Sequence, residues 1–296
     1  MCGIVGLFLK TDALQPQLGD LMSDMLITMT DRGPDSAGLA VYSDSAGYKL
    51  TVQTDDPDAA FPALEQWLAT HAPDATLRVM STHAVILGPE RLFDALPAAL
   101  AEAFPSVRIM SGGAAMEVFK EVGLPRDVAD RFDLRQMAGT HGIGHTRMAT
   151  ESAVTTDGAH PFSTGDDQCL VHNGSLSNHN SLRRKLVREG VAISSQNDSE
   201  VAAAYLTWKM RQGANLGEAL EMGLSDLDGF YTFVVGTRTG FGVLRDPIAC
   251  KPAVLAETDD YVAFGSEYRA LVGLPGIESA RVWEPEPATV YFWERA

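Results

Sequence analysis

MCGIVGLFL, at residues Met1–Leu9, begins the chain, and it sets the first expectation for the architecture. From Cys2 to Leu9, small and β-branched residues alternate, which is typical of a buried strand. Removal of Met1 leaves Cys2 with both a thiol and a free α-amine. Because its pKa is near ~7.7 to 8.0, such an amine can take the thiol proton at neutral pH without a histidine. The alternative is that Cys2 is only a small residue at the start of a strand, and position alone favours that alternative.

The composition is that of a globular protein with a substantial core. The 296 residues are 45% hydrophobic, enough for one large domain or two modest ones. The 39 acidic residues against 23 basic ones give a formal charge of -16. This charge repels phosphate backbones and leaves no basic stripe, so we expect neither nucleic acid nor an anionic membrane as a partner.

Targeting signals and the cysteines bear on the compartment. No apolar run approaches the ~20 residues of a transmembrane helix, and the N-terminus lacks the features of a signal peptide. Cys2, Cys169 and Cys250 are odd in number and widely spaced, which argues against a disulfide framework. We therefore expect a cytoplasmic protein, in which Cys250 is a packed thiol.

The pattern of elements favours a layered α+β fold over a doubly wound parallel sheet, because strands and helices come in blocks. A helix is expected from Leu18 to Met29, and the second half is rich in strands. The stretch from about 43 to 139 is an α/β excursion. We expect it to contain a loop at Thr54–Pro62, helices at Phe61–His71 and Glu90–Phe104, strands at Thr76–Leu87 and Val107–Met110, and two short helices parted by Pro125.

Five blocks of sequence carry a family resemblance. They are MCGIVG at the start, RGPDSAG at Arg32–Gly38, GHTRMAT at Gly144–Thr150, HNGSLSN at His172–Asn178 and NDSE at Asn197–Glu200. In this order they resemble the class II glutamine amidotransferase domain of the N-terminal nucleophile hydrolase superfamily. The resemblance spans nearly the whole chain except the excursion. It implies one domain over residues 2–296 with a four-layer αββα fold, in which two antiparallel sheets lie between layers of helices.

The resemblance also assigns roles to residues. Cys2 is the nucleophile, and Asn173 and Gly174 form the oxyanion hole, where two donors meet the negative oxygen of the tetrahedral intermediate. Arg147 holds the α-carboxylate of glutamine, for which a planar guanidinium is suited. Asp198 receives the α-ammonium, so that the site selects a zwitterionic amino acid.

Three further residues are implied with lesser roles. Arg32 supports the N-terminal cysteine and its neighbours. Thr150 and the backbone near Met148 line the pocket. Met148 is a departure, because several relatives carry an aromatic residue there, and a flexible thioether changes how the pocket closes.

The implied reaction is hydrolysis of glutamine to glutamate and ammonia. The length and the spelling of the blocks most resemble the stand-alone amidotransferase subunit of glutamate-synthase-like complexes, which include N-methylglutamate synthase of methylamine catabolism. The partners would be a flavin-binding synthase subunit and a β-helical subunit. We therefore expect no cofactor in this chain, with FMN and iron-sulfur on the partners.

Three alternatives remain open. In the first, the chain is a donor subunit for purine or aminosugar synthesis. In the second, it is an N-terminal nucleophile hydrolase that acts on another amide. In the third, it is a non-catalytic regulatory subunit in which Met1 stays in place. Single features also have plainer explanations, namely Asn173-Gly174 as a hairpin turn and Asp198 as a helix N-cap. His141 and His145 lack the helical spacing and the carboxylate of a zinc motif, so we expect no metal site.

Overall fold

The computed structural model describes residues 2–43, 47–149 and 153–295. Its largest sheet has seven strands in the order β15-β13-β14-β1-β8-β2-β7. These strands are Arg281–Trp283, Val254–Glu257, Tyr261–Gly265, Gly3–Leu9, His141–Arg147, Ser36–Tyr42 and Met116–Val122. Neighbouring strands in this sheet run antiparallel. The N-terminal strand β1 therefore lies in the middle of the sheet, between β14 and β8.

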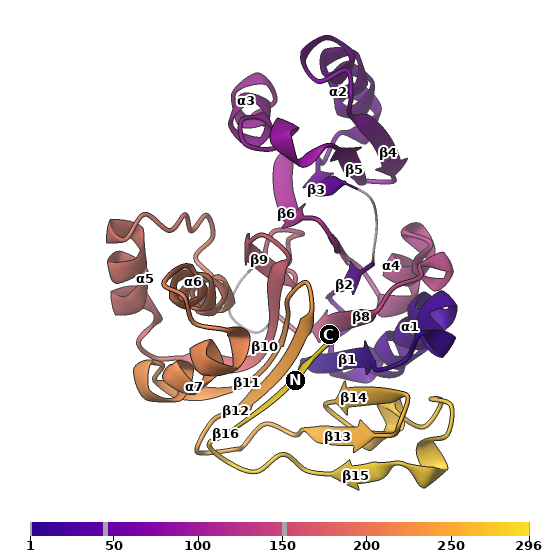
Figure 1. Ribbon diagram of the computed structural model, residues 1–296, viewed down its shortest axis with the longest axis vertical. Helices are drawn as coiled ribbons and strands as arrows, with labels where there is room; N and C mark the ends of the chain where they lie inside the picture. Colours follow the sequence, from indigo (N-terminus) through magenta and orange to yellow (C-terminus); the bar gives the residue numbers. More distant parts are fainter. Residues whose placement is uncertain (1, 44–46, 150–152, 296) are drawn as a thin grey trace.

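A second antiparallel sheet packs against the first (Figure 1). Its five strands follow the order β16-β12-β11-β10-β9, with bounds Thr289–Glu294, Gly240–Arg245, Gly229–Gly236, Gln168–Leu176 and Phe162–Gly165. Alternation along β1 explains how the sheets meet. Ile4 and Phe8 join a buried cluster with Val234 and Phe241 of the second sheet. Burial of each such side chain stabilises the fold by roughly 1.5–3 kcal/mol.

Helices cover the two outer faces. Val5 and Leu7 of β1 face the other way, into a cluster with Leu18 and Met22 of α1, and α4 joins the same cluster. The outer face of the second sheet is covered by α5, α6 and α7. These five helices are Leu18–Thr28, Pro125–Arg131, His179–Arg188, Asp198–Arg211 and Leu216–Asp226. The four-layer αββα order expected from the sequence is confirmed.

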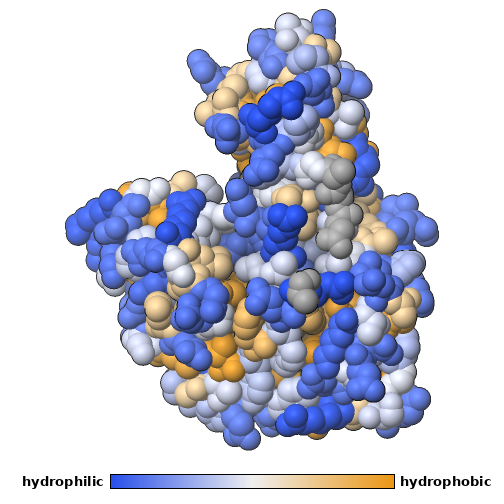
Figure 2. Space-filling view, in the orientation of Figure 1, coloured by the Kyte–Doolittle hydropathy of each residue, from blue (hydrophilic) through white to orange (hydrophobic). Residues whose placement is uncertain are grey.

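A third, smaller sheet forms a separate lobe, the small-sheet lobe (Figures 1 and 2). Its order is β4-β5-β3-β6, with bounds Thr76–Met80, His83–Gly88, Tyr48–Gln53 and Arg108–Gly113, and it carries the helices α2 (Pro57–His71) and α3 (Leu96–Ala103). The lobe has its own hydrophobic cluster. It is inserted between β2 and β7, which are neighbours in the large sheet and place Gly38 opposite Lys120.

Several expectations within the excursion were wrong. Thr76–Leu87 is not one strand but the hairpin β4–β5, which turns at Ser81 with φ 57°. Residues Met116–Val122 form strand β7 instead of a short helix, because the alternating apolar side chains of MEVFKEV pair with β2. Helix α2 begins at Pro57, within the expected loop, because Asp56 caps it by accepting a hydrogen bond from the Ala59 amide.

Candidate active site

Cys2 directly precedes β1 and is half-buried. Its carbonyl oxygen accepts hydrogen bonds from Nε of Arg32 at 2.9 Å and from Nδ2 of Asn173 at 3.1 Å. Its thiol lies 3.9 Å from the carbonyl oxygen of Met148. Cys2 therefore contacts residues from three of the five sequence blocks, although they are far apart in the chain. Met1 lies outside the described residues.

Arg32 ends a short 3-10 helix, η2 (Thr30–Arg32), and is 8% exposed. Its Nη1 donates to Oε1 of Glu267 at 2.7 Å, and Arg269 pairs with the other oxygen of that carboxylate at 2.7 Å. The hydrogen bond from Arg32 is the largest cause that lowers the pKa of Glu267. Sequence reasoning missed Glu267, because a carboxylate 235 positions away gives no local signal.

Asn173 and Gly174 lie in β10, which pairs with β11. Asn173 is 4% exposed, with its side-chain amide directed at Cys2. Gly174 has φ +148°, and a Cβ at this position would lie 2.0 Å from the carbonyl oxygen of Phe230. A residue with a side chain does not fit there, because the contact would be with backbone. The pair is thus part of a strand and not the two-residue turn that was the alternative.

Arg147 ends β8 and is 7% exposed. Its Nη1 donates to the carbonyl oxygen of Ala153 at 3.4 Å. The Arg147 carbonyl accepts from the Asp35 amide at 3.0 Å, and the Asp35 carboxylate accepts from the Ala149 amide at 2.8 Å. These bonds join the second and third sequence blocks. Met148 follows and is 36% exposed, whereas Thr150 lies outside the described residues.

Asp198 is the first residue of α6, and the helix is capped instead by Asn197, whose side chain accepts from the Ser199 amide. Asp198 as the N-cap was therefore wrong. Its carboxylate accepts from the Leu176 amide at 2.9 Å. This bond ties the start of α6 to the end of β10, two residues beyond Gly174. The structure thus brings the Asp198 carboxylate close to the end of β10, which spacing in the sequence did not reveal.

Buried histidines lie beneath these residues. The hydroxyl of Ser199 is 2.8 Å from Nε2 of His160 and 2.9 Å from Nδ1 of His172. Nε2 of His145 donates to the carbonyl oxygen of His172 at 3.1 Å, and its ring stacks on His160 at 4.1 Å between centroids. Burial lowers the pKa of His145 to about 3 and that of His172 to about 4. These side chains are therefore neutral at pH 7 and hold the second sheet, the first sheet and α6 together.

The other cysteines and possible metal ligands lie apart from this site. Cys169 is buried, with Sγ 3.2 Å from the Tyr42 hydroxyl, and burial raises the pKa of its thiol to about 12. Cys250 is exposed, so its expected packing was wrong. Within residues 2–43, 47–149 and 153–295, no group of His, Cys, Asp or Glu side chains is arranged to hold a metal ion. No helix in the same ranges is long and apolar enough to cross a membrane.

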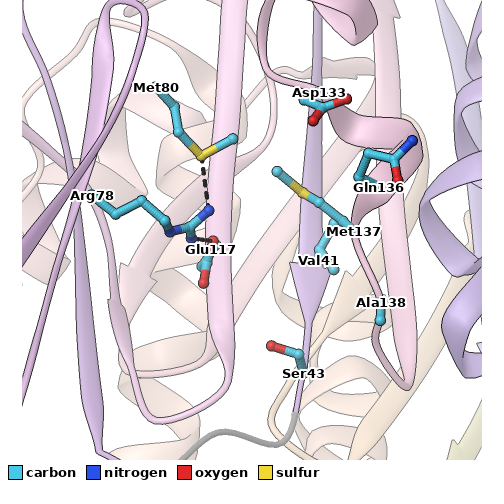
Figure 3. Close-up of a pocket in the computed structure, with 9 residues that line it drawn as sticks. All are labelled: Val41, Ser43, Arg78, Met80, Glu117, Asp133, Gln136, Met137 and Ala138. Carbon is cyan, nitrogen blue, oxygen red and sulfur yellow. Dashed lines mark hydrogen bonds and ion pairs between the residues drawn. The ribbon is translucent and has the colours of Figure 1, made fainter.

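Two hollows of the surface lie elsewhere. One of about 250 Å³ is bounded by Val41, Arg78, Glu117 and Met137 (Figure 3). In it, Arg78 donates to Sδ of Met80 and pairs with Glu117. A larger hollow of about 700 Å³ lies at the base of the small-sheet lobe, where Figure 2 shows a recess on the side of α5. Neither is lined by Cys2, Asn173, Arg147 or Asp198.

The αββα core agrees with the comparisons. Residues 145–273 match the family model described as a glutamine amidotransferase domain. The chain belongs to the class II glutamine amidotransferases. It is 68% identical over 297 residues to the glutamine amidotransferase-like protein GlxB of Rhizobium meliloti (strain 1021), covering 99% of this chain and 98% of that protein.

A more distant relative agrees with this assignment, and a solved structure shares the fold. A putative glutamine amidotransferase of Methanothermobacter thermautotrophicus is 32% identical over 307 residues, covering 99% of this chain and all of that protein (100%). In fold, the chain is similar to the glutamine phosphoribosylpyrophosphate amidotransferase of B. subtilis, with a TM-score of 0.62 and 19% identity. That likeness covers 99% of this chain and 47% of the other.

Proposed function

We propose that this chain hydrolyses glutamine with Cys2 as the nucleophile. The observation that supports the proposal is the hydrogen bond of 3.1 Å from the Asn173 amide to the Cys2 carbonyl, because it brings a side-chain N–H donor next to Cys2. Removal of Met1 frees the α-amine, which takes the thiol proton. The thiolate then attacks the side-chain carbonyl carbon of glutamine, and Asn173 with the Gly174 amide stabilises the negative oxygen.

The remaining steps release both products. The protonated amine passes its proton to the leaving nitrogen, the carbon–nitrogen bond breaks, and ammonia departs. Water then attacks the γ-glutamyl thioester, so that glutamate leaves and the Cys2 thiol is restored. No cofactor is required for these proton transfers.

Recognition of glutamine rests on charge at both ends of the amino acid. In this proposal Arg147 binds the α-carboxylate in a bidentate manner and Asp198 binds the α-ammonium. Arg32 holds the backbone of Cys2 in place, and Met148 and Thr150 line the pocket. A simple amide lacks both charges and is discriminated against.

The ammonia acceptor in this proposal is a separate synthase. The spelling of the sequence blocks favours an N-methylglutamate synthase or another glutamate-synthase-like complex, with FMN and iron-sulfur on flavin-binding and β-helical partner subunits. A reducing compartment such as the cytoplasm suits a reactive thiol at Cys2. Residues 2–296 then act as one domain, and its α/β excursion at about 43–139 contains the small-sheet lobe.

Purification of the protein from its native host tests the partner. The tag belongs at the C-terminus, so that the α-amine of Cys2 is free. We expect flavin-binding synthase subunits to co-purify, as identified by mass spectrometry and by flavin absorbance. Recovery of a purine or aminosugar synthase as the stable partner would instead replace the proposed complex, and the hydrolytic proposal would stand.

Substitution Asn173→Ala tests the oxyanion hole. We expect kcat for glutamine hydrolysis to fall roughly 100- to 1,000-fold, because one preorganised donor is lost. Steady-state release of ammonia measures this effect. Asn178→Ala is the matched control, since its amide donates at 2.9 Å to the carbonyl of Asp226, away from Cys2. Equal losses in the two variants would remove Asn173 from the proposed mechanism.

A further inference from the structure

The described loop between β8 and β9, residues 153–161, lies against the guanidinium of Arg147. Nη1 of Arg147 donates to the carbonyl of Ala153 at 3.4 Å. A Cβ added to Gly158 would lie 3.2 Å from the same nitrogen. The loop is therefore hydrogen-bonded to Arg147 at Ala153 and leaves little room for a side chain at Gly158, so its position limits where the guanidinium lies.

Lys120 of β7 holds this loop from the other side. Its ammonium donates to the carbonyl oxygens of Ala159 at 2.8 Å, Pro161 at 3.2 Å and Asp157 at 3.4 Å. A lysine ammonium has three N–H donors and no acceptor. All three N–H groups of Lys120 therefore donate to backbone carbonyls of every second residue in one loop, which wraps around the ammonium group.

Gly38 and Phe162 lie next to Lys120, where its side chain contacts the loop. Gly38 lies opposite it in the β2–β7 pair, and a Cβ there would be 2.2 Å from the carbonyl of His160 and 2.5 Å from Cβ of Lys120. Because Gly38 has no side chain, Lys120 and the loop can approach each other at this position. Nζ also lies 4.6 Å from the ring centre of Phe162, a favourable distance for a cation over an aromatic face.

The position of Lys120 is costly for stability. The side chain is 5% exposed, and among the residues that the structure describes it forms no ion pair. Burial lowers its pKa to about 8. An apolar side chain would avoid the cost of burying a charge. A function for the ammonium is therefore a better explanation than packing.

We propose that Lys120 is a positioning residue for the α-carboxylate of glutamine, since its three hydrogen bonds fix the loop that contacts Arg147. This inference rests on the proposed role of Arg147. It concerns the binding of glutamine and not the chemical steps at Cys2. Lys120 and Glu121 hold the loop together, because the hydroxyl of Thr156 donates to the Glu121 carboxylate.

Substitution Lys120→Met tests the proposal, since methionine keeps an unbranched chain and removes every donor. We expect KM for glutamine to rise roughly 10- to 100-fold, because a small misplacement of a binding group has an effect of that order. The value of kcat should change little. The preference for glutamine over 4-aminobutanamide, which lacks the α-carboxylate, should fall by a similar factor.

Lys49→Met is the matched control. Lys49 is also buried, at 3% exposed, but its ammonium contacts Ser43, the carbonyl of Ala115 and Glu117, away from the loop. We expect the KM of Lys49→Met for glutamine to stay at the wild-type value, measured at temperatures where Lys49→Met and Lys120→Met are both folded. A second variant, Lys120→Gln, keeps an amide with two N–H donors and should give an intermediate KM.

Separate outcomes distinguish this inference from the proposed function. Unchanged KM in Lys120→Met, or equal losses on glutamine and 4-aminobutanamide, would overturn the positioning role. Failure of both Lys120 variants to fold while Lys49→Met folds would also overturn it, because Lys120 would then serve stability alone. If the wild-type enzyme with Met1 removed hydrolyses no glutamine, the proposed function itself fails.

Discussion

Replacement of Cys2 by alanine is expected to abolish glutamine hydrolysis. Loss of the catalytic nucleophile alone lowers kcat by about 10⁶-fold in a well-studied serine protease. The physical reason is that water must then attack an unactivated amide, although the oxyanion donors remain. Ammonia release from glutamine, measured with purified protein whose intact mass shows removal of Met1, gives the result.

Two controls sharpen the Cys2 experiment. Cys250→Ala removes an exposed thiol outside the site, so its activity should equal that of the wild-type protein. Cys2→Ala should keep the wild-type thermal unfolding midpoint, because the side chain is half-buried and lies outside the strand core. Hydrolysis that persists in a homogeneous Cys2→Ala preparation would exclude Cys2 as the nucleophile.

Loss of stability below pH 6.5 is the second large effect that we expect. Burial lowers the pKa values of His83, His141 and His145 to about 3, from an ordinary value of 6.5. In the unfolded chain these side chains take up protons as the pH falls below 6.5, whereas in the folded protein they stay neutral. Unfolding is therefore coupled to proton uptake, and stability falls as pH decreases between 6.5 and about 3.

The size of this effect follows from linkage. At pH 5, each of the three histidines destabilises the fold by about 2 kcal/mol relative to pH 7 or above, since each pH unit below the unfolded pKa contributes about 1.4 kcal/mol. Their sum, about 6 kcal/mol, is comparable to the whole stability of many domains. Urea unfolding followed by tryptophan fluorescence at pH 8, 7, 6 and 5 measures it.

A variant of His83 tests the assignment. His83 packs against Phe119 and Phe132, and its Nε2 is buried with no hydrogen-bond partner among the described residues. His83→Leu should reduce the loss of unfolding free energy between pH 8 and pH 5 by about 2 kcal/mol. A loss in His83→Leu equal to that of the wild-type protein would contradict the explanation.

Many of the chemical groups at the site were predictable from the sequence. Cys2, Arg147, Asn173 and Asp198 each stand in a short block and supply, in that order, a thiol, a guanidinium, an amide donor and a carboxylate. The four-layer fold was also predicted, since the blocks appear in their family order. Within the excursion, the hairpin β4–β5 was missed because Thr76–Leu87 is a nearly continuous strand-like run, and its turn depends on the positive φ of Ser81.

Contacts between distant residues were not predictable from local patterns. Glu267 follows β14, which pairs with β1, and it meets Arg32 because Arg32 is hydrogen-bonded to Cys2 at the start of β1. Ser199 meets His160 and His172 because α6 packs on the second sheet. No local pattern indicated that Lys120 is buried against the loop 153–161.

Local sequence therefore specified which chemical groups the site contains. It also specified most of the strands and helices, because the spacing of apolar side chains that predicts them is a property of neighbouring residues. Strand register, sheet packing and the approach of loops specified which of those groups meet. These depend on contacts across more than a hundred positions, such as those from Cys2 to Asn173, and they form only when the two sheets bury their shared apolar face.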